Sequence, residues 1–270
     1  MKINEQDVIN KYLLGKSVLA LSYEYNTYTQ KIQNILDKNN INKISTAKRK
    51  NPNLIENYFE IINDPNKAYW IGWILTDGGV NNKNGLEISL QSCDKYILDM
   101  LQNDLGLNDH VYLFNNDYYK FSFYCKKMID DLTKYNIIPN KSLTLKYPTN
   151  IPKEYETHLL RGMFEGDGGL TVSISTRFYK HRNKSYTKPY RELSFTGTYD
   201  MCKNFHDKLK EYAVYTPKRI HKNNSVYRVR WSNADEIISI FHALYDNCGT
   251  HYLKRKYELF KQIEDRKYHK

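Results

Sequence analysis

Apolar side chains in the first part of the chain recur at the spacing of short amphipathic helices. This spacing predicts a helix over 7–14, which Gly15 ends, and a second helix that Ser17 caps. A third helix is expected to begin near Tyr28 after a short polar turn. We therefore expect residues 1–40 to form a small all-α unit.

After a polar and basic linker, expected over 41–56, the chain runs through the same order of elements twice. In the first half, a helix that ends in Asp77-Gly78-Gly79 precedes strands and helices expected over 86–91, 94–105, 119–123 and 128–135. In the second half, a helix that ends in Asp167-Gly168-Gly169 precedes elements expected over 170–176, 192–196, 200–212, 226–231 and 235–245. The two aspartates are 90 residues apart. The pattern predicts an α/β (α+β) fold of two αββαββα halves, 57–150 and 151–270, related by a pseudo-twofold axis.

Each half opens with a helix that has a glycine five residues before its aspartate, Gly72 before Asp77 and Gly162 before Asp167. A glycine inside a helix costs about 1 kcal/mol relative to alanine, so a pair at matching positions calls for a packing reason. We expect the two helices to pack against each other at these glycines. The two carboxylates would then converge at the same end of the helix pair.

Composition narrows the classes of protein that fit. The chain has 270 residues and a formal net charge of +11, which favours a polyanionic partner. No apolar run approaches the roughly 20 residues of a membrane helix, and no segment near the start resembles a signal peptide. The four cysteines form no CxxC pair and the histidines no HExxH motif, which disfavours a zinc site. We expect no membrane partner and no secretion, but a cytoplasmic protein, bacterial or phage-encoded, or an organellar one.

The repeated helices and their Asp-Gly ends resemble the double-motif, single-chain LAGLIDADG homing endonucleases. The resemblance covers the chain from about residue 57 onward and departs from the name-giving pattern at several apolar positions of both helices. It implies a site-specific endonuclease, freestanding or intron-encoded, that hydrolyses both strands of double-stranded DNA and acts as a monomer. In that family the motif aspartates hold divalent metal, which here implies Asp77 and Asp167 with Mg²⁺ or Mn²⁺. The chemistry agrees, since phosphodiester hydrolysis uses metal ions held by oxygen ligands.

The same resemblance implies two supporting catalytic residues. Gln91 ends the strand over 86–91, where family members often carry a polar residue that orients water. Lys126 follows the strand over 119–123, where the family often has a basic residue near the scissile phosphate. Glu165 is expected to face elsewhere and receives no role.

The resemblance also implies a saddle of antiparallel strands whose outward side chains read the major groove, because alternating strands keep one polar face. Arg228 and Arg230 are the leading candidates, since arginine pairs bidentately with guanine. The other strand candidates are Glu87, Ser89, Lys120, Ser122, Ser173, Ser175, Arg177, Arg191 and Ser194. A basic loop over 178–188 is expected to contact phosphates. The first forty residues resemble a helix-turn-helix, whose third helix would present Thr29, Gln30 and Gln33 to bases.

Two other functions remain open at this point. A transcription regulator of the same fold would bind DNA without cutting it, and such a protein is expected to lose the carboxylates that are retained here. An intron maturase would bind structured RNA without any need for them. The retained Asp77 and Asp167 favour the endonuclease.

Overall fold

The computed structural model describes residues 3–179 and 183–268. The N-terminal unit consists of three helices, α1 (Glu5–Leu13), α2 (Val18–Glu24) and α3 (Thr29–Lys38). Asn4 caps α1, which begins two residues earlier than its apolar pattern indicates, and Ser17 caps α2 through a hydrogen bond to the Ala20 amide. The unit has a hydrophobic core of its own, made by Val8, Ile9, Tyr12, Leu21, Ile32, Ile35 and Leu36.

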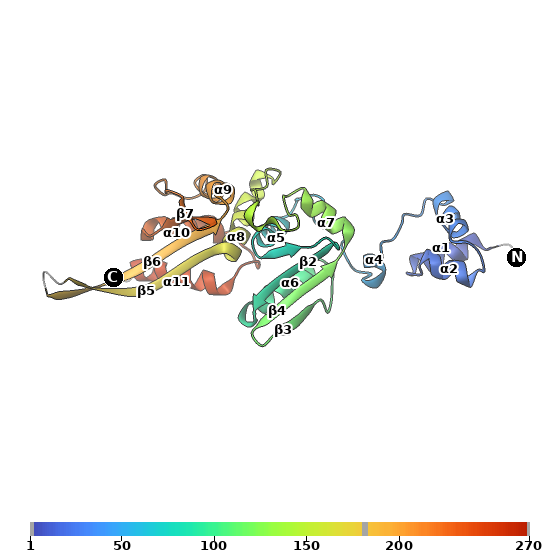
Figure 1. The fold of residues 1–270 in the computed structure, drawn as a ribbon, viewed down its shortest axis with the longest axis horizontal. Coiled ribbons are helices and arrows are strands. Elements are labelled where there is room, and N and C mark those ends of the chain that lie inside the picture. Colours follow the sequence, from blue (N-terminus) through green and yellow to red (C-terminus); the bar gives the residue numbers. More distant parts are fainter. Residues whose placement is uncertain (1–2, 180–182, 269–270) are drawn as a thin grey trace.

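The segment expected as a plain linker contains a short helix, α4 (Thr46–Lys50), capped by Ser45. Tyr12 of the N-terminal core reaches this segment, because its hydroxyl accepts hydrogen bonds from the Ile44 amide and the Arg49 guanidinium. The N-terminal helices and α4 lie at one end of the molecule, beyond the first half (Figure 1).

The first half begins with α5 (Pro65–Thr76), whose end leads directly into β1 (Gly78–Val80). It continues with β2 (Gly85–Gln91), α6 (Lys95–Asp104), β3 (Val111–Asn115), β4 (Tyr118–Tyr124) and α7 (Lys126–Thr133). The strands form an antiparallel sheet in the order β1-β2-β4-β3. Leu86, Ile88, Phe121 and Phe123 are buried on one face, so the residues between them form the other.

The second half repeats this plan with α8 (Glu156–Asp167), β5 (Gly168–Tyr179), β6 (Lys184–Gly197) and α9 (Tyr199–Leu209). It ends with β7 (His221–Asn223), β8 (Val226–Trp231), α10 (Ala234–Tyr245) and α11 (Lys254–Tyr268). The sheet order is β5-β6-β8-β7, the same as in the first half. The fold class predicted from the sequence is therefore confirmed: a mixed α/β protein with two antiparallel four-stranded sheets and a small helical part before them.

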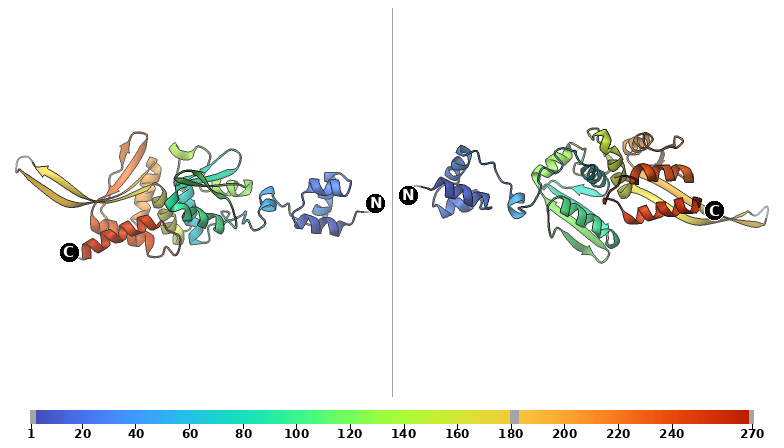
Figure 2. Two further views of the ribbon diagram at one scale, coloured as in Figure 1. Left: turned by 90° about the horizontal axis from the view of Figure 1, so that it is seen from below. Right: turned by 180° about the vertical axis from the view of Figure 1, so that it is seen from behind.

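The two halves differ most in their first hairpin. β1 has three residues, whereas β5 has 12 and β6 has 14. The expected basic loop over 178–188 was wrong at its ends, because Phe178 pairs with Ser185 and Tyr179 with Lys184 in continuous strands. Its centre, 180–182, lies outside the described residues. This hairpin extends from the second half at the end of the molecule opposite the N-terminal helices (Figure 2).

One hydrophobic core runs through both halves and includes side chains from α5, α8 and both sheets. Within the described ranges, no helix is long and apolar enough to cross a membrane.

Candidate active site

The helices α5 and α8 cross with their backbones in contact at Gly72 and Gly162. A Cβ atom on Gly72 would lie 2.3 Å from the carbonyl oxygen of Leu159, and one on Gly162 would lie 2.1 Å from that of Tyr69. Any side chain at either position would force the helices apart. The close crossing fixes the ends of both helices relative to each other.

Asp77 and Asp167 lie at that common end, each followed by the first strand of its half. A Cβ on Gly166, next to Asp167, would lie 3.4 Å from Asp77 Oδ2, so the two helix ends are in contact. Both aspartates reach solvent, yet protein surrounds them on several sides. This partial desolvation raises the pKa of both carboxyls, and the charge of Asp77 raises that of Asp167 further, to about 6.

A pair of repelling, solvent-accessible carboxylates suits a hard divalent cation, which prefers oxygen ligands and keeps several waters. Within the described residues, no group of three or more His, Cys, Asp or Glu side chains is arranged to hold a metal. The donor set at the helix ends therefore fits a metal bound through few protein ligands, with the remaining positions left to water and substrate.

Two buried lysines flank the carboxylates. The ammonium group of Lys141 donates to the carbonyl oxygen of Gly78, directly after Asp77. Lys256 of α11 donates to the carbonyl oxygens of Phe164, Glu165 and Gly168 around Asp167, at 2.7, 2.7 and 2.5 Å. Burial lowers the pKa of both lysines, that of Lys256 to about 7, while the charges of the two aspartates oppose the shift.

Sequence reasoning missed both lysines. Lys141 lies in a short 3-10 turn after the last helix of the first half, and Lys256 lies in a helix with the highly polar sequence of a solvated element. Neither position carries a local signal of burial, because only the tertiary fold brings each ammonium group to its aspartate. Their matching places, one in each half, are a property of the fold that the linear pattern does not show.

The two sequence-predicted supporting residues lie in different places. Gln91 is exposed and ends β2. Because Gly78, which follows Asp77, pairs with Ile88, this end of β2 is the end of the sheet nearest Asp77. Lys126 begins α7, after the opposite end of β4, and pairs with Asp130 at 2.8 Å. The lysines whose charges act on Asp77 are Lys256 and Lys141. The structure thus does not bring Lys126 to the carboxylates, whereas Lys141 does lie beside Asp77.

Glu165 lies inside the helix crossing. Its buried Oε2 accepts hydrogen bonds from the Tyr69 hydroxyl at 2.6 Å and from the Trp73 indole at 3.3 Å. Both donors belong to α5, so this carboxylate joins the two halves directly behind the aspartates. The structure places it away from the solvent-exposed site, as expected, and gives it a packing contact across the two helices.

The polar face of the first sheet gathers the strand residues predicted there. Register pairs Glu87 with Ser122 and Ser89 with Lys120, so all four lie on the face opposite the core. Lys120 forms an ion pair with Glu87 at 2.6 Å and lies over the Phe114 ring. The cation predicted to contact DNA is therefore already paired within the sheet.

On the second sheet, Arg228 and Arg230 lie on the polar face, and both are held by Glu192, which the sequence reading did not select. Arg228 contacts Glu192 at 2.9 Å and Arg230 contacts it at 3.6 Å. Ser173 is exposed on the same face, because it pairs with Tyr190 two positions from Glu192.

Two of the predicted contacts on this sheet need correction. Ser194 is only 3% exposed, and its hydroxyl oxygen accepts a hydrogen bond from Arg228, so it supports the arginine instead of reaching a base. Arg191 pairs with Val172 and has the same parity as the buried Leu193, which places it on the opposite face. Ser175 and Arg177 lie in β5, but their side chains are outside the described part of the structure.

The third helix of the N-terminal unit exposes Thr29 and Gln30, whereas Gln33 is half-buried. Gln30 donates to Asn34 at 2.9 Å and Gln33 donates to Asp37 at 2.8 Å, both along the helix surface. The amide groups proposed to read bases are thus engaged in exposed contacts within α3, which solvent or a ligand can replace at little cost.

No protein-family model matches the chain, and no curated protein matches it. Solved structures do match. The meganuclease I-SmaMI bound to uncleaveable DNA aligns with a TM-score of 0.52 and 13% identity, covering 75% of this chain and 89% of that one. I-SmaMI bound to uncleaved DNA in the presence of calcium ions aligns with a TM-score of 0.52 and 12% identity, covering 76% of this chain and 92% of that one. The LAGLIDADG homing endonuclease I-LtrWI bound to target DNA aligns with a TM-score of 0.52 and 14% identity, covering 78% of this chain and 91% of that one. The chain therefore has the fold of the LAGLIDADG homing endonucleases.

Proposed function

We propose that this chain is a site-specific, metal-dependent endonuclease that hydrolyses both strands of double-stranded DNA. The observation that carries the proposal is the meeting of Asp77 and Asp167 at one end of the α5–α8 crossing. A single aspartate at a helix end is an ordinary turn residue. Two of them on helix ends that touch, one from each half and each with a buried lysine beside it, form a more specific arrangement.

Asp77 and Asp167 would hold the divalent metal, Mg²⁺ or Mn²⁺. A bound ion of this kind supplies a reactive water nucleophile at neutral pH and electrostatic stabilisation of charge on the phosphate. The protein's own contribution is a pair of carboxylates kept close by a helix crossing that admits no side chain. Their raised pKa values reflect the same crowding, which binding of a cation would offset.

Lys141 and Lys256 would act in two ways. Each ammonium group holds the backbone that follows or surrounds one aspartate, which keeps that carboxylate in place. Each also contributes positive charge near the point where a phosphodiester develops negative charge during cleavage. Gln91, at the nearby end of β2, remains a candidate for orienting water.

The polar faces of the two sheets would contact the duplex on either side of the aspartates, with the single chain acting as a monomer whose halves are related by internal pseudo-symmetry. The net charge of +11 fits this partner, because each phosphate contact releases counterions. Arg228 and Arg230 are the side chains best suited to guanine. The N-terminal helices would add a helix-turn-helix contact through α3. As a homing endonuclease, the chain would be either freestanding or encoded within an intron.

Incubation of the purified chain with a randomised duplex library, with Mg²⁺ or with EDTA, tests the function. We expect metal-dependent cutting of one enriched sequence by the wild-type protein and none by the Asp77→Asn/Asp167→Asn variant. Salt-sensitive duplex binding by both proteins without any cutting would instead indicate a DNA-binding regulator. Preference for structured RNA over duplex DNA would indicate a maturase.

A further inference from the structure

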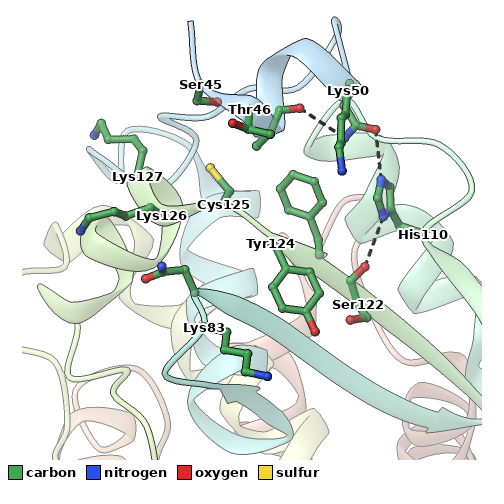
Figure 3. A pocket seen from close by; sticks show the side chains of 14 residues that line it. Ser45, Thr46, Lys50, Lys83, His110, Ser122, Tyr124, Cys125, Lys126 and Lys127 are labelled. Carbon is green, nitrogen blue, oxygen red and sulfur yellow. Dashed lines mark hydrogen bonds between the residues drawn. The ribbon is translucent and has the colours of Figure 1, made fainter. Parts of the chain in front are cut away.

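A cavity of about 530 Å³ lies between the linker helix α4 and the outer end of the first sheet. Four lysines line it: Lys50 from α4, Lys83 from the β1–β2 turn, and Lys126 and Lys127 from the start of α7. Figure 3 shows Lys50 near Thr46 of α4, with Lys83, Lys126 and Lys127 elsewhere around the cavity. We call this space the linker-helix cavity.

Two of these four lysines are paired with carboxylates, Lys127 with Glu60 as well as with α7, and two are not paired within the described part of the chain. No aspartate or glutamate is among its lining residues. Lys126 and Lys127 have acidic partners on α7, at Asp130 and Asp131. Lys50 and Lys83 are exposed and have no acidic partner among the described residues. Such a gathering of like charges is unfavourable in isolation, so it indicates a polyanionic ligand.

The cavity borders both faces of the first sheet at the end of β4, since the buried Phe123 and Cys125 also line it. Ser122 and Tyr124 line it, and they alternate along β4 with the buried Phe121 and Phe123. They therefore share a face with Glu87 and Lys120. A duplex lying on this face would reach the cavity at the outer end of β4.

The linker segment is attached to the sheet at this point. Nε2 of His110 lies 3.1 Å from Asn51 Oδ1, and its Nδ1 lies 3.2 Å from the carbonyl oxygen of Ser122. The His110 ring also packs edge-on against Phe123. This bridge joins the chain just after α4 to strand β4, so Lys50 is presented from an anchored segment.

The linker-helix cavity lies where the two halves differ most, at their first hairpin. The second half extends its sheet with the long β5–β6 hairpin, whereas the β1–β2 hairpin closes after three residues of β1. Lys83 lies in that short turn, across the linker-helix cavity from α4 (Figure 3). The linker helix thus occupies the end of the first half, where no long hairpin is available to follow a duplex outward.

We propose that the linker-helix cavity binds the phosphodiester backbone of duplex DNA that continues past the first half. The cavity would make the outer contact with DNA for which the β1–β2 hairpin is too short. The inference rests on the proposed function for its partner, double-stranded DNA. Lys50 and Lys83 supply the free cations, and Lys126 and Lys127 add charge around them. The contact positions the duplex and reads no base, as is typical of phosphate contacts.

The test measures binding of the full chain to a labelled duplex of arbitrary sequence, about 40 base pairs or four helical turns long, over a series of salt concentrations without metal. We compare the Lys50→Gln/Lys83→Gln variant with Lys203→Gln/Lys210→Gln, which removes the same charge from α9 and its C-terminal cap. Phe205 of α9 stacks on Phe195, so α9 covers the core face of the second sheet, away from the polar face. The slope of log affinity against log salt is expected to fall by roughly 1.8 for the first variant, about 0.9 for each lost phosphate contact, and to stay unchanged for the second.

An unchanged slope for Lys50→Gln/Lys83→Gln, with wild-type binding intact, would overturn the inference while leaving the endonuclease proposal untouched. Binding of inorganic phosphate that Lys50→Gln/Lys83→Gln abolishes, without any change in DNA binding, would also overturn it and indicate a small-anion site. Because the measurement needs no cutting, a failure of the proposed nuclease activity appears separately, in the library assay.

Discussion

The Cα atom of Gly72 lies 3.1 Å from the position that a Cβ on Gly162 would occupy. These two glycines come from different halves of the chain, so the molecule's central contact is one backbone against another. The carboxylates of Asp77 and Asp167 lie one and a half turns further along the same two helices. Their spacing thus depends directly on the absence of side chains at the crossing.

The first prediction concerns this crossing. Replacing Gly162 with Ala is expected to lower the free energy of unfolding by about 1–3 kcal/mol or more, because the new methyl group meets backbone atoms that cannot rotate away. Urea unfolding monitored by circular dichroism measures the loss. Gly79→Ala is the matched control, since the nearest atom to its new Cβ lies at 3.9 Å. Equal stability of the two variants would contradict the close crossing.

The second prediction separates binding from cutting. Asp77→Asn is expected to reduce cleavage of the selected site at least about a thousandfold, about 4 kcal/mol in barrier, with duplex affinity nearly unchanged. Single-turnover cleavage and a binding titration without metal measure the two quantities. Asp130→Asn, which removes an exposed carboxylate distant from the helix ends, serves as the control. Wild-type cleavage by Asp77→Asn would exclude this residue as a metal ligand.

The third prediction concerns pH. The folded-state pKa of Asp167 is raised to about 6, above its ordinary value of 3.8, so its ionised form is disfavoured in the fold. The cost of ionisation is fully present above pH 6 and disappears as the pH falls from 6 towards 4. Without metal, Asp167→Asn is therefore expected to be more stable than the wild type at pH 7, with the difference shrinking at lower pH. Unfolding curves of both proteins over this range measure it, and a difference independent of pH would contradict the assignment.

The fourth prediction concerns the buried lysine of α11. Lys256→Met removes the donor to three backbone carbonyls around Asp167 and a positive charge beside it. Cleavage is expected to fall about a hundredfold or more while the duplex still binds. Lys261→Met on the same helix removes a surface lysine that pairs with Glu264, and it should cut at the wild-type rate. The same loss in both variants would indicate that general charge, and not this position, matters.

The fifth prediction concerns base reading on the second sheet. Glu192 holds Arg228 and Arg230, which limits the positions their guanidinium groups adopt. Glu192→Gln is expected to bind duplex DNA more tightly, because a negative charge is lost, and to discriminate less between single-base variants of the selected site. Competition binding with a panel of such variants measures both effects. Tighter binding with unchanged discrimination would show that Glu192 does not position the arginines.

Much of the fold could be predicted because its signals are local and repeated. Gly72 and Gly162 predict a close helix crossing, and the Asp-Gly-Gly turns predict the start of each sheet. The length of the β5–β6 hairpin was underestimated because the sequence over 180–188 is mostly polar and basic, which resembles a loop. Register, however, continues their pairing to Tyr179 and Lys184.

The site was less predictable because its charges come together only in three dimensions. Lys141 and Lys256 are buried by neighbours distant in sequence, so no period in the chain marks them. Arg191 was assigned to the wrong face although its parity with Leu193 was visible, because the assignment followed residue type instead of alternation. Glu192 was not selected although it has the same parity as Ser194, which was selected.

The buried Glu165 makes the two halves complementary and no longer interchangeable. Its counterpart in the first half, 90 residues earlier, is Leu75, and the counterparts of its donors Tyr69 and Trp73 are Leu159 and Met163. In a homodimer of the second half, aliphatic side chains would replace both α5 donors, so each buried carboxylate would lose the hydrogen bonds that Tyr69 and Trp73 supply. A homodimer of the first half would leave two tyrosine hydroxyls facing leucine. The contact therefore favours pairing of one half with the other over pairing of either half with itself.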